Sequence, residues 1–253
     1  MEITKIKKVG KDTYNVTFDN KREYLLYEDI IIKNLLTENK IIDENSFNKI
    51  KAENDEIKVY NQGIKYIGVR QRSEKEIYNY LSNKNDNQLL VNKVIKRLKI
   101  EGYIDDLLFA TAFINDKMYL SSQGPYRIKR ELQEHDIKEE IIAGLINNID
   151  KDLIKDKITK IINKQLKIYT KYNGMVLKKK ILFFLINRGY DKEDIIKELD
   201  KINFNDNEKL KKEYQKVVVQ LSKKYTGYEL KTRIKNKLFQ KGFDVNEINN
   251  IML

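Results

Sequence analysis

The sequence predicts a mainly α-helical protein of tandem three-helix repeats that form an elongated, curved body, preceded by a small antiparallel β segment. Three observations lead to this fold class. Among 253 residues there are 10 glycines and one proline, which are too few chain breakers for an all-β fold with a turn every ten residues or so. Apolar residues recur at helical spacing over most of the chain. The strongest signal is an internal repeat with a period of 53 residues.

The N-terminal region is predicted to form strands and then helices. Residues 13–18 alternate polar and apolar side chains with the period of two that a half-buried strand shows, and a turn precedes a further strand over 22–27. The spacing then becomes helical. It predicts a longer helix over 47–67, a polar loop over 37–45, and before them a short helix that carries Ile31, Leu35 and Leu36.

Twelve apolar or aromatic positions define the repeat. They fall in three copies, each 53 residues from the next: Ile128, Leu132, Ile137 and Ile142; Ile181, Leu185, Tyr190 and Ile195; Ile234, Leu238, Phe243 and Ile248. Each copy begins with a helix that ends near Gly189 or its counterpart Gly242, where glycine favours a left-handed C-cap. The next residue is aromatic and packs back on that helix, a second helix follows, and the remaining length accommodates a third. An earlier copy begins at Ile77 and is interrupted at Asp86.

One such unit cannot bury its apolar face alone, so neighbouring units must stack. We therefore expect an N-terminal region over 1–71, three-helix repeats over 72–123, 124–175 and 176–227, and a partial repeat over 228–253. Three helix starts agree with this division. Ser73 and Glu76 form a capping box, Pro125 suits the first position of a helix, and Asp105 is placed to cap the helix that follows it.

Few residues in this chain suit catalysis or metal binding. The sequence has no cysteine and one histidine, which excludes disulfides, thiolate zinc sites, iron–sulfur clusters and a cysteine nucleophile. N-capping explains the paired carboxylates Asp105 and Asp106 better than a metal does, and His135, near a helix C-terminus, suits a structural role. Glycine-rich phosphate-binding motifs are absent. We expect a protein without enzymatic activity, cofactor or metal.

The longest apolar run, 181–186, is too short to cross a bilayer, and the N-terminus has no hydrophobic signal core. These features predict a cytoplasmic protein without a membrane partner.

The net charge of +12 is unevenly distributed along the chain. Residues 1–66 carry 12 basic and 12 acidic side chains, whereas residues 67–253 carry 38 basic and 26 acidic ones. An excess of this size favours a polyanion such as nucleic acid, or an acidic protein surface, as the partner. The alternative is that the many lysines, asparagines and isoleucines reflect an AT-rich coding sequence.

The candidate partner- or DNA-binding residues lie at the start of the first helix of each repeat: Arg70, Arg72, Arg127, Lys129, Arg130, Lys180 and Arg233. Three of them, Arg127, Lys180 and Arg233, are 53 residues apart, so stacked repeats would align them as a stripe suited to phosphates or acidic side chains. Ordinary solvation of a helix face is the alternative. Tyrosines also lie among lysines, at positions 169, 172, 225 and 228. They suit stacking on single-stranded bases, although packing between repeats accounts better for their helical spacing.

Three motifs in order resemble the bacterial RecX family: Arg70-Gln71-Arg72-Ser73-Glu74-Lys75-Glu76-Ile77, then Gly102-Tyr103-Ile104-Asp105-Asp106 with Phe109-Ala110, then Gly124-Pro125-Tyr126-Arg127-Ile128-Lys129-Arg130-Glu131-Leu132. The resemblance covers about residues 60–253, and the additional segments at both ends look like those of the longer Gram-positive members. The sequence departs from the family at His135-Asp136-Ile137, where a Lys-Gly pair usually precedes the aliphatic residue. That change weakens the expected C-cap.

The resemblance implies a non-enzymatic modulator of the recombinase RecA, with roles in homologous recombination, DNA repair and the SOS response. Such a protein lies in the groove of the RecA filament on single-stranded DNA and inhibits filament growth, ATP hydrolysis, strand exchange and co-protease activity. The family supplies no catalytic residues. We expect a monomer that binds the RecA filament, with single-stranded DNA as a further direct partner. Two other hypotheses stay open: a basic helical-repeat protein that binds DNA directly, and a scaffold for another acidic partner.

Overall fold

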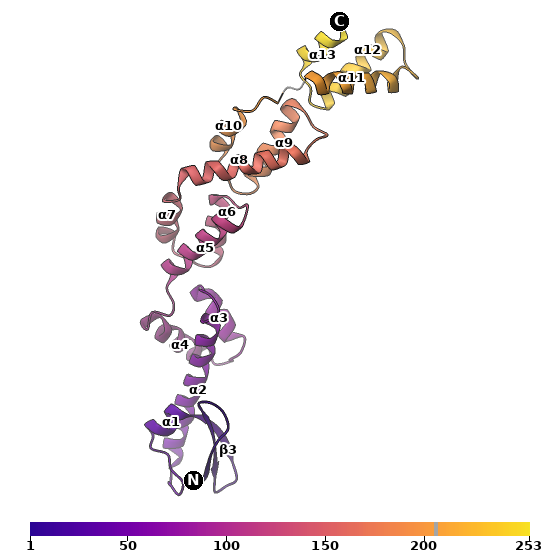
Figure 1. Ribbon diagram of the computed structural model, residues 1–253. Coiled ribbons are helices and arrows are strands. Elements are labelled where there is room, and N and C mark those ends of the chain that lie inside the picture. Colours follow the sequence, from indigo (N-terminus) through magenta and orange to yellow (C-terminus); the bar gives the residue numbers. More distant parts are fainter. Residues whose placement is uncertain (205–206) are drawn as a thin grey trace. The chain divides into compact units, whose positions relative to one another are not determined.

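The computed structural model describes residues 1–204 and 207–253. The chain divides into two compact units. Unit 1 comprises Met1–Ala110 together with His135–Ile137, and unit 2 comprises Thr111–Glu134 and Lys138–Leu253. Helices dominate both units, and a three-stranded antiparallel sheet lies at the N-terminus (Figure 1). The expected fold class, a mainly helical protein with a small N-terminal β segment, is confirmed.

The sheet consists of β1 (Ile3–Lys8), β2 (Thr13–Phe18) and β3 (Glu23–Tyr27) in chain order. Its inward side chains, including Val16 and Phe18, pack on α1 (Glu28–Lys33) and on the first turns of α2 (Glu44–Ile67). The buried Asn54 of α2 fastens helix to sheet, because its side chain accepts from the backbone N–H of Tyr27 and donates to the carbonyl of Leu25. The open edge of β3 is therefore partly covered by a side-chain amide.

The short first helix ends earlier than the sequence predicts. It stops at Lys33, so Leu35 and Leu36 lie beyond it. Leu35 has a left-handed backbone, with φ of 47°, and it is 75% exposed, whereas Leu36 turns back into the core and is 5% exposed. The helical spacing of apolar residues extends past the end of the helix, because the turn that follows the helix returns Leu36 to the core.

The remaining helices of the described chain follow in three groups. The first comprises α3 (Glu74–Ser82), α4 (Gln88–Ile100) and α5 (Asp106–Leu120). The second comprises α6 (Pro125–Glu134), α7 (Glu139–Asn147) and α8 (Lys151–Ile168). The third comprises α9 (Gly174–Ile186), α10 (Lys192–Leu199) and α11 (Asn207–Leu221), and α12 (Gly227–Gln240) and α13 (Val245–Met252) end the chain.

All twelve positions of the sequence repeat are buried, none of them more than 5% exposed. Ile77 and Leu81 of α3 and Val91 of α4 are buried as well, and Asp86, which interrupts the pattern, is exposed. The glycines that follow the first helices have positive φ, 86° at Gly189 and 92° at Gly242. The period of 53 residues therefore identifies the helix faces that form the core, because a burial pattern recurs only when the packing recurs.

The helices that share a core are grouped differently from the expected divisions. α8, α9 and α10 enclose one core, and α11, α12 and α13 enclose another. In unit 1 the end of α2 packs with α3 and α4. A sequence period gives the length of a repeat and leaves its starting point open, so the divisions 72–123, 124–175, 176–227 and 228–253 stay a prediction.

One type of contact recurs between successive groups, and two copies of it lie in unit 2. Gly124, just before α6, donates its N–H to the carbonyl of Arg188 at 2.7 Å, and Tyr126 donates to Gly189 at 2.9 Å. Asn173, just before α9, likewise donates its N–H to the carbonyl of Lys241 at 3.2 Å. Each contact joins the start of one first helix to the glycine turn that ends the next.

Side chains are excluded from these contacts at the glycines. A Cβ added to Gly189 would lie 2.6 Å from the Cβ of Arg127, and one added to Gly242 would lie 2.8 Å from the Cβ of Val176. Because real Cβ atoms do not approach so closely, the two glycines are required by close approach as well as by their left-handed backbone.

Unit 1 contains the counterpart of these contacts at Ser73 and His135. The turn residue there is Asp136, which adopts a left-handed φ of 59°, so an aspartate takes the conformation that glycine takes in the other two copies. The C-cap geometry survives the departure from the Lys-Gly pair. Among the described residues, no helix combines the length and apolar character needed to cross a bilayer.

Candidate partner-binding surface

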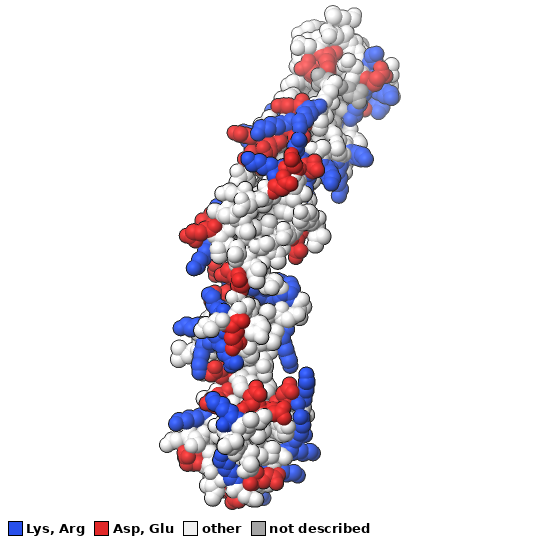
Figure 2. Space-filling view, turned by 60° about the vertical axis from the view of Figure 1, so that its left-hand side comes forward, with Lys and Arg blue, Asp and Glu red and all other residues white. Residues whose placement is uncertain are grey.

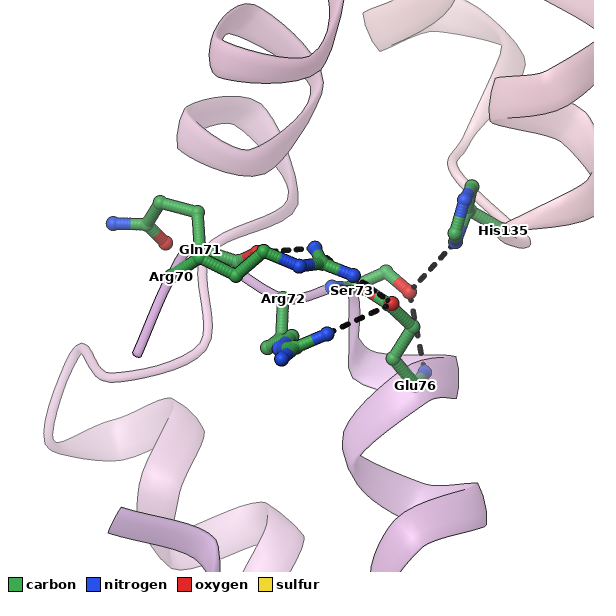
Figure 3. Close-up of polar contacts among 6 residues, drawn as sticks. All are labelled: Arg70, Gln71, Arg72, Ser73, Glu76 and His135. Atoms are coloured by element: carbon green, nitrogen blue, oxygen red, sulfur yellow. Dashed lines mark hydrogen bonds and ion pairs between the residues drawn. The ribbon is translucent and has the colours of Figure 1, made fainter. Parts of the chain in front are cut away.

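The segment before α3 carries the first two predicted site residues. Ser73 caps α3 by accepting from the N–H of Glu76, and the Glu76 carboxylate accepts in return from the N–H of Ser73. Arg70 and Arg72 both direct their guanidinium groups to that carboxylate, at 2.6 Å and 3.5 Å (Figure 3). Burial acts to raise the pKa of Glu76, but the bonds from Arg70 and Ser73 outweigh it and the pKa is lowered.

Arg72 is held inside the fold more firmly than Arg70. Its guanidinium lies over the ring of Tyr66, 4.2 Å from the centroid, and its side chain is 14% exposed. The ring of Tyr66 in turn stacks on Tyr80 at 4.0 Å. The Arg70 side chain is 52% exposed. Arg72 therefore fixes the start of α3, and Arg70 is the one of the pair that solvent and a partner reach.

His135 has a structural environment, in agreement with the sequence prediction. Its Nδ1 lies 3.2 Å from the hydroxyl of Ser73, which is fully buried (Figure 3). The same hydroxyl accepts from the N–H of Glu76, so Ser73 connects the start of α3 to the imidazole. The ring of Phe109 meets the imidazole edge-to-face, with the centroids 5.0 Å apart. These contacts occupy His135 as a packing residue at the contact between helical groups.

The three predicted site residues of α6 are each paired with a glutamate. Arg127 contacts Glu131 at 3.3 Å, Arg130 contacts Glu134 at 3.9 Å, and Lys129 bonds to Glu139 of α7. Arg130 is the most exposed of the three, at 68% of its side chain. The Arg130–Glu134 pair is exposed on both sides, and exposed pairs of this kind contribute little to stability.

Lys180 and Arg233 lie over tyrosine rings that repeat with the same period. Lys180 is 4.2 Å from the centroid of Tyr172, and Arg233 is 4.0 Å from that of Tyr225. Arg233 also bonds to Glu229 at 2.8 Å. Tyrosines occur at 66, 119, 172 and 225, each 53 residues from the next. Three of the four are covered by a cation, so part of the recurrence of basic residues reflects a repeated cation–π contact that fastens the first helix.

The two other tyrosines that the sequence singled out have different environments. Tyr169 packs against the core of α8, α9 and α10, with its ring edge-to-face on Phe184 at 6.4 Å. Tyr228 is 85% exposed. Packing therefore explains Tyr169, whereas Tyr228 presents its ring to solvent.

Of the paired carboxylates at the start of α5, Asp105 has the capping role expected from the sequence. Asp105 accepts from the N–H groups of Leu107 and Leu108, at 2.8 and 3.0 Å. Burial raises the pKa of Asp106. Within the described part of the chain, no cluster of three or more histidine, aspartate or glutamate side chains has a metal-binding arrangement.

On the face shown in Figure 2, acidic and basic side chains lie near one another. Figure 2 shows Lys and Arg beside Asp and Glu on the face in view, without a wholly basic area. All seven predicted site residues have a carboxylate or a tyrosine as partner. Sequence reasoning missed three exposed lysines of α8, at positions 160, 164 and 167, whose side chains have no ion pair among the described residues. The signal is present in the sequence, because no aspartate or glutamate occurs between Asp156 and Asp191.

Comparison with known proteins gives a consistent relationship. The model for "RecX, second three-helix domain" matches residues 105–144, which span α5 to α7. The regulatory protein RecX of Streptococcus agalactiae serotype III (strain NEM316) is 31% identical over all of this chain and 98% of its own length. That of Streptococcus thermophilus (strain CNRZ 1066) is 30% identical over 98% of this chain and 97% of its own.

Solved structures share the fold. A crystal structure of regulatory protein RecX superposes with a TM-score of 0.67 at 21% identity, over 79% of this chain and 98% of that one. RecX from Lactobacillus salivarius superposes with a TM-score of 0.54 at 24% identity, over 58% of this chain and 98% of that one. Taken together with the full-length sequence identity, the repeated helical groups and the three motifs, these matches show that the chain belongs to the RecX family of regulatory proteins.

Proposed function

We propose that this chain is a regulator that binds the filament of RecA on single-stranded DNA and inhibits its ATP hydrolysis, strand exchange and co-protease activity. The observation that carries the proposal is the relationship, along the whole chain, to proteins named regulatory protein RecX. The protein acts by binding, as a monomer, and catalyses no reaction itself.

The charge distribution supports a polyanionic partner for unit 2. Unit 2 carries 30 basic and 19 acidic residues, an excess of 11, whereas unit 1 carries 20 basic and 19 acidic, an excess of one. A long-range positive field accelerates encounter with a negatively charged filament. Unit 2 is therefore the part of the chain that would meet the filament first.

The predicted site residues would make the contacts with the filament. Arg70 and Arg130 suit this role best, since both side chains are more than half exposed. Arg127, Lys180 and Arg233 would act together, because each immediately precedes a buried isoleucine at the same position of its helix. Lys129 would exchange its glutamate for a partner carboxylate or phosphate, and Arg72 would hold the segment that presents Arg70.

The test is the ATPase activity of RecA on single-stranded DNA. Substoichiometric amounts of this protein should lower the turnover, because one regulator bound in a filament acts on many RecA subunits. Unchanged turnover at saturating protein would refute the proposal. A heat-unfolded sample of the same chain controls for its charge alone.

The contribution of Arg127, Lys180 and Arg233 is tested by replacing all three with alanine. The variant should retain its helical circular dichroism and inhibit RecA more weakly. The matched control replaces three exposed lysines outside the first helices, in K192A/K212A/K223A, with the same loss of charge. Equal inhibition by the two variants would refute a specific role for the three predicted residues.

A direct DNA-binding protein is the second hypothesis, favoured by the charge of unit 2. It predicts tight binding to bare DNA. On a duplex, the logarithm of the binding constant should fall with the logarithm of the salt concentration, with a slope of about −0.9 per neutralised phosphate. Strong binding to the RecA filament with weak binding to bare DNA would reject it in favour of the first proposal.

A further inference from the structure

The segment from residue 157 to residue 190 carries basic side chains and no acidic ones. It contains eight lysines and one arginine, and it contains no aspartate or glutamate. Elsewhere in the chain acidic residues separate the basic ones at shorter intervals. The segment includes most of α8, the turn after it and α9.

Three of the nine cations bond to oxygen atoms inside the fold, and a fourth, Lys180, lies over the ring of Tyr172. Lys157 donates to backbone carbonyls at the end of α5, among them that of Ser121 at 3.0 Å. Lys178 pairs with Asp200 at 2.5 Å, and Arg188 donates to the hydroxyl of Ser122 at 2.7 Å. These side chains hold neighbouring elements together, and they are not available to a ligand.

Three other cations form a line along one side of α8, which we call the α8 lysine line: Lys160, Lys164 and Lys167. Steps of four and three residues keep them on one side of the helix. All three are exposed, and within the described residues none of their side chains has an ion pair or a hydrogen bond. The opposite side of α8 carries the core residues Ile158 and Ile162.

The arrangement of the line is unfavourable for the isolated protein. Like charges three and four residues apart on a helix repel each other and destabilise it. Among the described residues no carboxylate pairs with these lysines, whereas the basic residues of α6 all have one. An external polyanion would relieve it, and would place negative charges along about 10 Å of helix at about 1.5 Å per residue.

Tyr172, which lies beyond the end of α8, is not available to stack on a base. Its ring packs against the core of α8, α9 and α10, and Lys180 lies 4.2 Å from the ring centroid. Contact of the line with nucleic acid therefore depends on its lysines, which bind phosphates. In the RecA filament of the proposed function these phosphates belong to a single strand.

We infer that the α8 lysine line binds the phosphate backbone of single-stranded DNA. The inference rests on the proposed function and deepens it, because it names the DNA strand of the filament as a component that this protein contacts directly. Lysines give sequence-independent binding, since an ammonium group contacts phosphates without reading base edges.

The test compares two variants of α8 with the same change in charge. K160Q/K164Q removes two members of the line. K151Q/K155Q removes two exposed lysines that also lie four residues apart on the same helix, but on its opposite side. Fluorescence anisotropy of a labelled oligothymidylate measures the affinity of the full-length protein for bare single strands over a range of salt concentrations. Circular dichroism verifies that both variants retain the fold.

Each phosphate contact on a single strand contributes about 0.7 to the slope with which the logarithm of the binding constant falls as the logarithm of the salt concentration rises. K160Q/K164Q should therefore reduce the slope by about 1.4 and weaken binding about 25-fold at 0.1 M salt. K151Q/K155Q should lie near the wild type. An equal effect of the two variants would overturn the inference, because net charge alone would then explain binding. Tighter binding to a duplex, lost in K160Q/K164Q, would overturn the assignment to single strands.

The RecA ATPase separates this inference from the proposed function. If K160Q/K164Q loses binding to single strands and still inhibits RecA, the DNA contact is supported and inhibition depends on the protein contacts. If wild-type protein binds the oligonucleotide and does not inhibit RecA, the proposed function fails and the DNA contact stands. If K160Q/K164Q binds the oligonucleotide as wild type does and loses affinity for RecA without DNA, the line meets protein and the inference is wrong.

Discussion

Replacement of Gly189 by alanine tests whether the contact between α6 and the end of α9 is as tight as the structure shows. Two effects add at this position. The left-handed φ of 86° costs alanine roughly 1–2 kcal/mol. The new Cβ would also lie 2.6 Å from the Cβ of Arg127 and close to its backbone, which cannot rotate away. Overpacking of this kind typically costs about 1–3 kcal/mol.

The matched control is Gly227, in the same unit. Its φ is 58°, and a Cβ there would meet nothing within 4 Å. G227A therefore contains the backbone cost of about 1–2 kcal/mol without the collision, and G189A should cost about 2–5 kcal/mol. Urea unfolding followed by far-UV circular dichroism measures both free energies, with unchanged m values as the sign that the unfolded states are comparable. Equal destabilisation by the two variants would refute the close approach at Gly189.

Three further predictions concern single residues. D136G should stabilise the protein by about 1 kcal/mol, because glycine adopts its φ of 59° without strain; a lower thermal midpoint would contradict this. Burial acts to raise the pKa of Glu131, but hydrogen bonds from Lys117 and Arg127 outweigh it and the pKa is lowered. The ionised carboxylate therefore stabilises the folded protein above the unfolded pKa of this residue, and this stabilisation is lost as the pH falls through the folded pKa. E131Q should therefore be less stable than wild type at neutral pH, and the difference in thermal midpoint should shrink in acid; a constant difference would refute the pairing. K157M should cost about 1–3 kcal/mol in urea unfolding, because it leaves carbonyls at the end of α5 without a donor; no change would show that water replaces the ammonium group.

The candidate site was predicted from sequence only in part. The recurrence of Arg127, Lys180 and Arg233 is visible in the sequence, because a basic residue precedes the first isoleucine of each copy of the 53-residue repeat. Their partners cannot be predicted from the sequence. Glu131 and Glu229 are only two of many glutamates near basic residues along the chain, and the tyrosine rings come to lie under the cations only when the helices pack. The exposure of Arg72 could not be predicted either, because Tyr66 reaches it from the preceding helix.

The sequence alone determined which residues form the core of the repeated helices, because burial imposes a period on apolar side chains and every one of the twelve repeat positions is buried. It also determined the capping box at Ser73 and the left-handed turns at Gly189 and Gly242, since these depend on local backbone chemistry. Only the tertiary structure decided which helices share a core and which lysines stay unpaired. Both depend on residues that are distant in the sequence and become neighbours only when the chain folds, so the sequence pattern alone does not predict them.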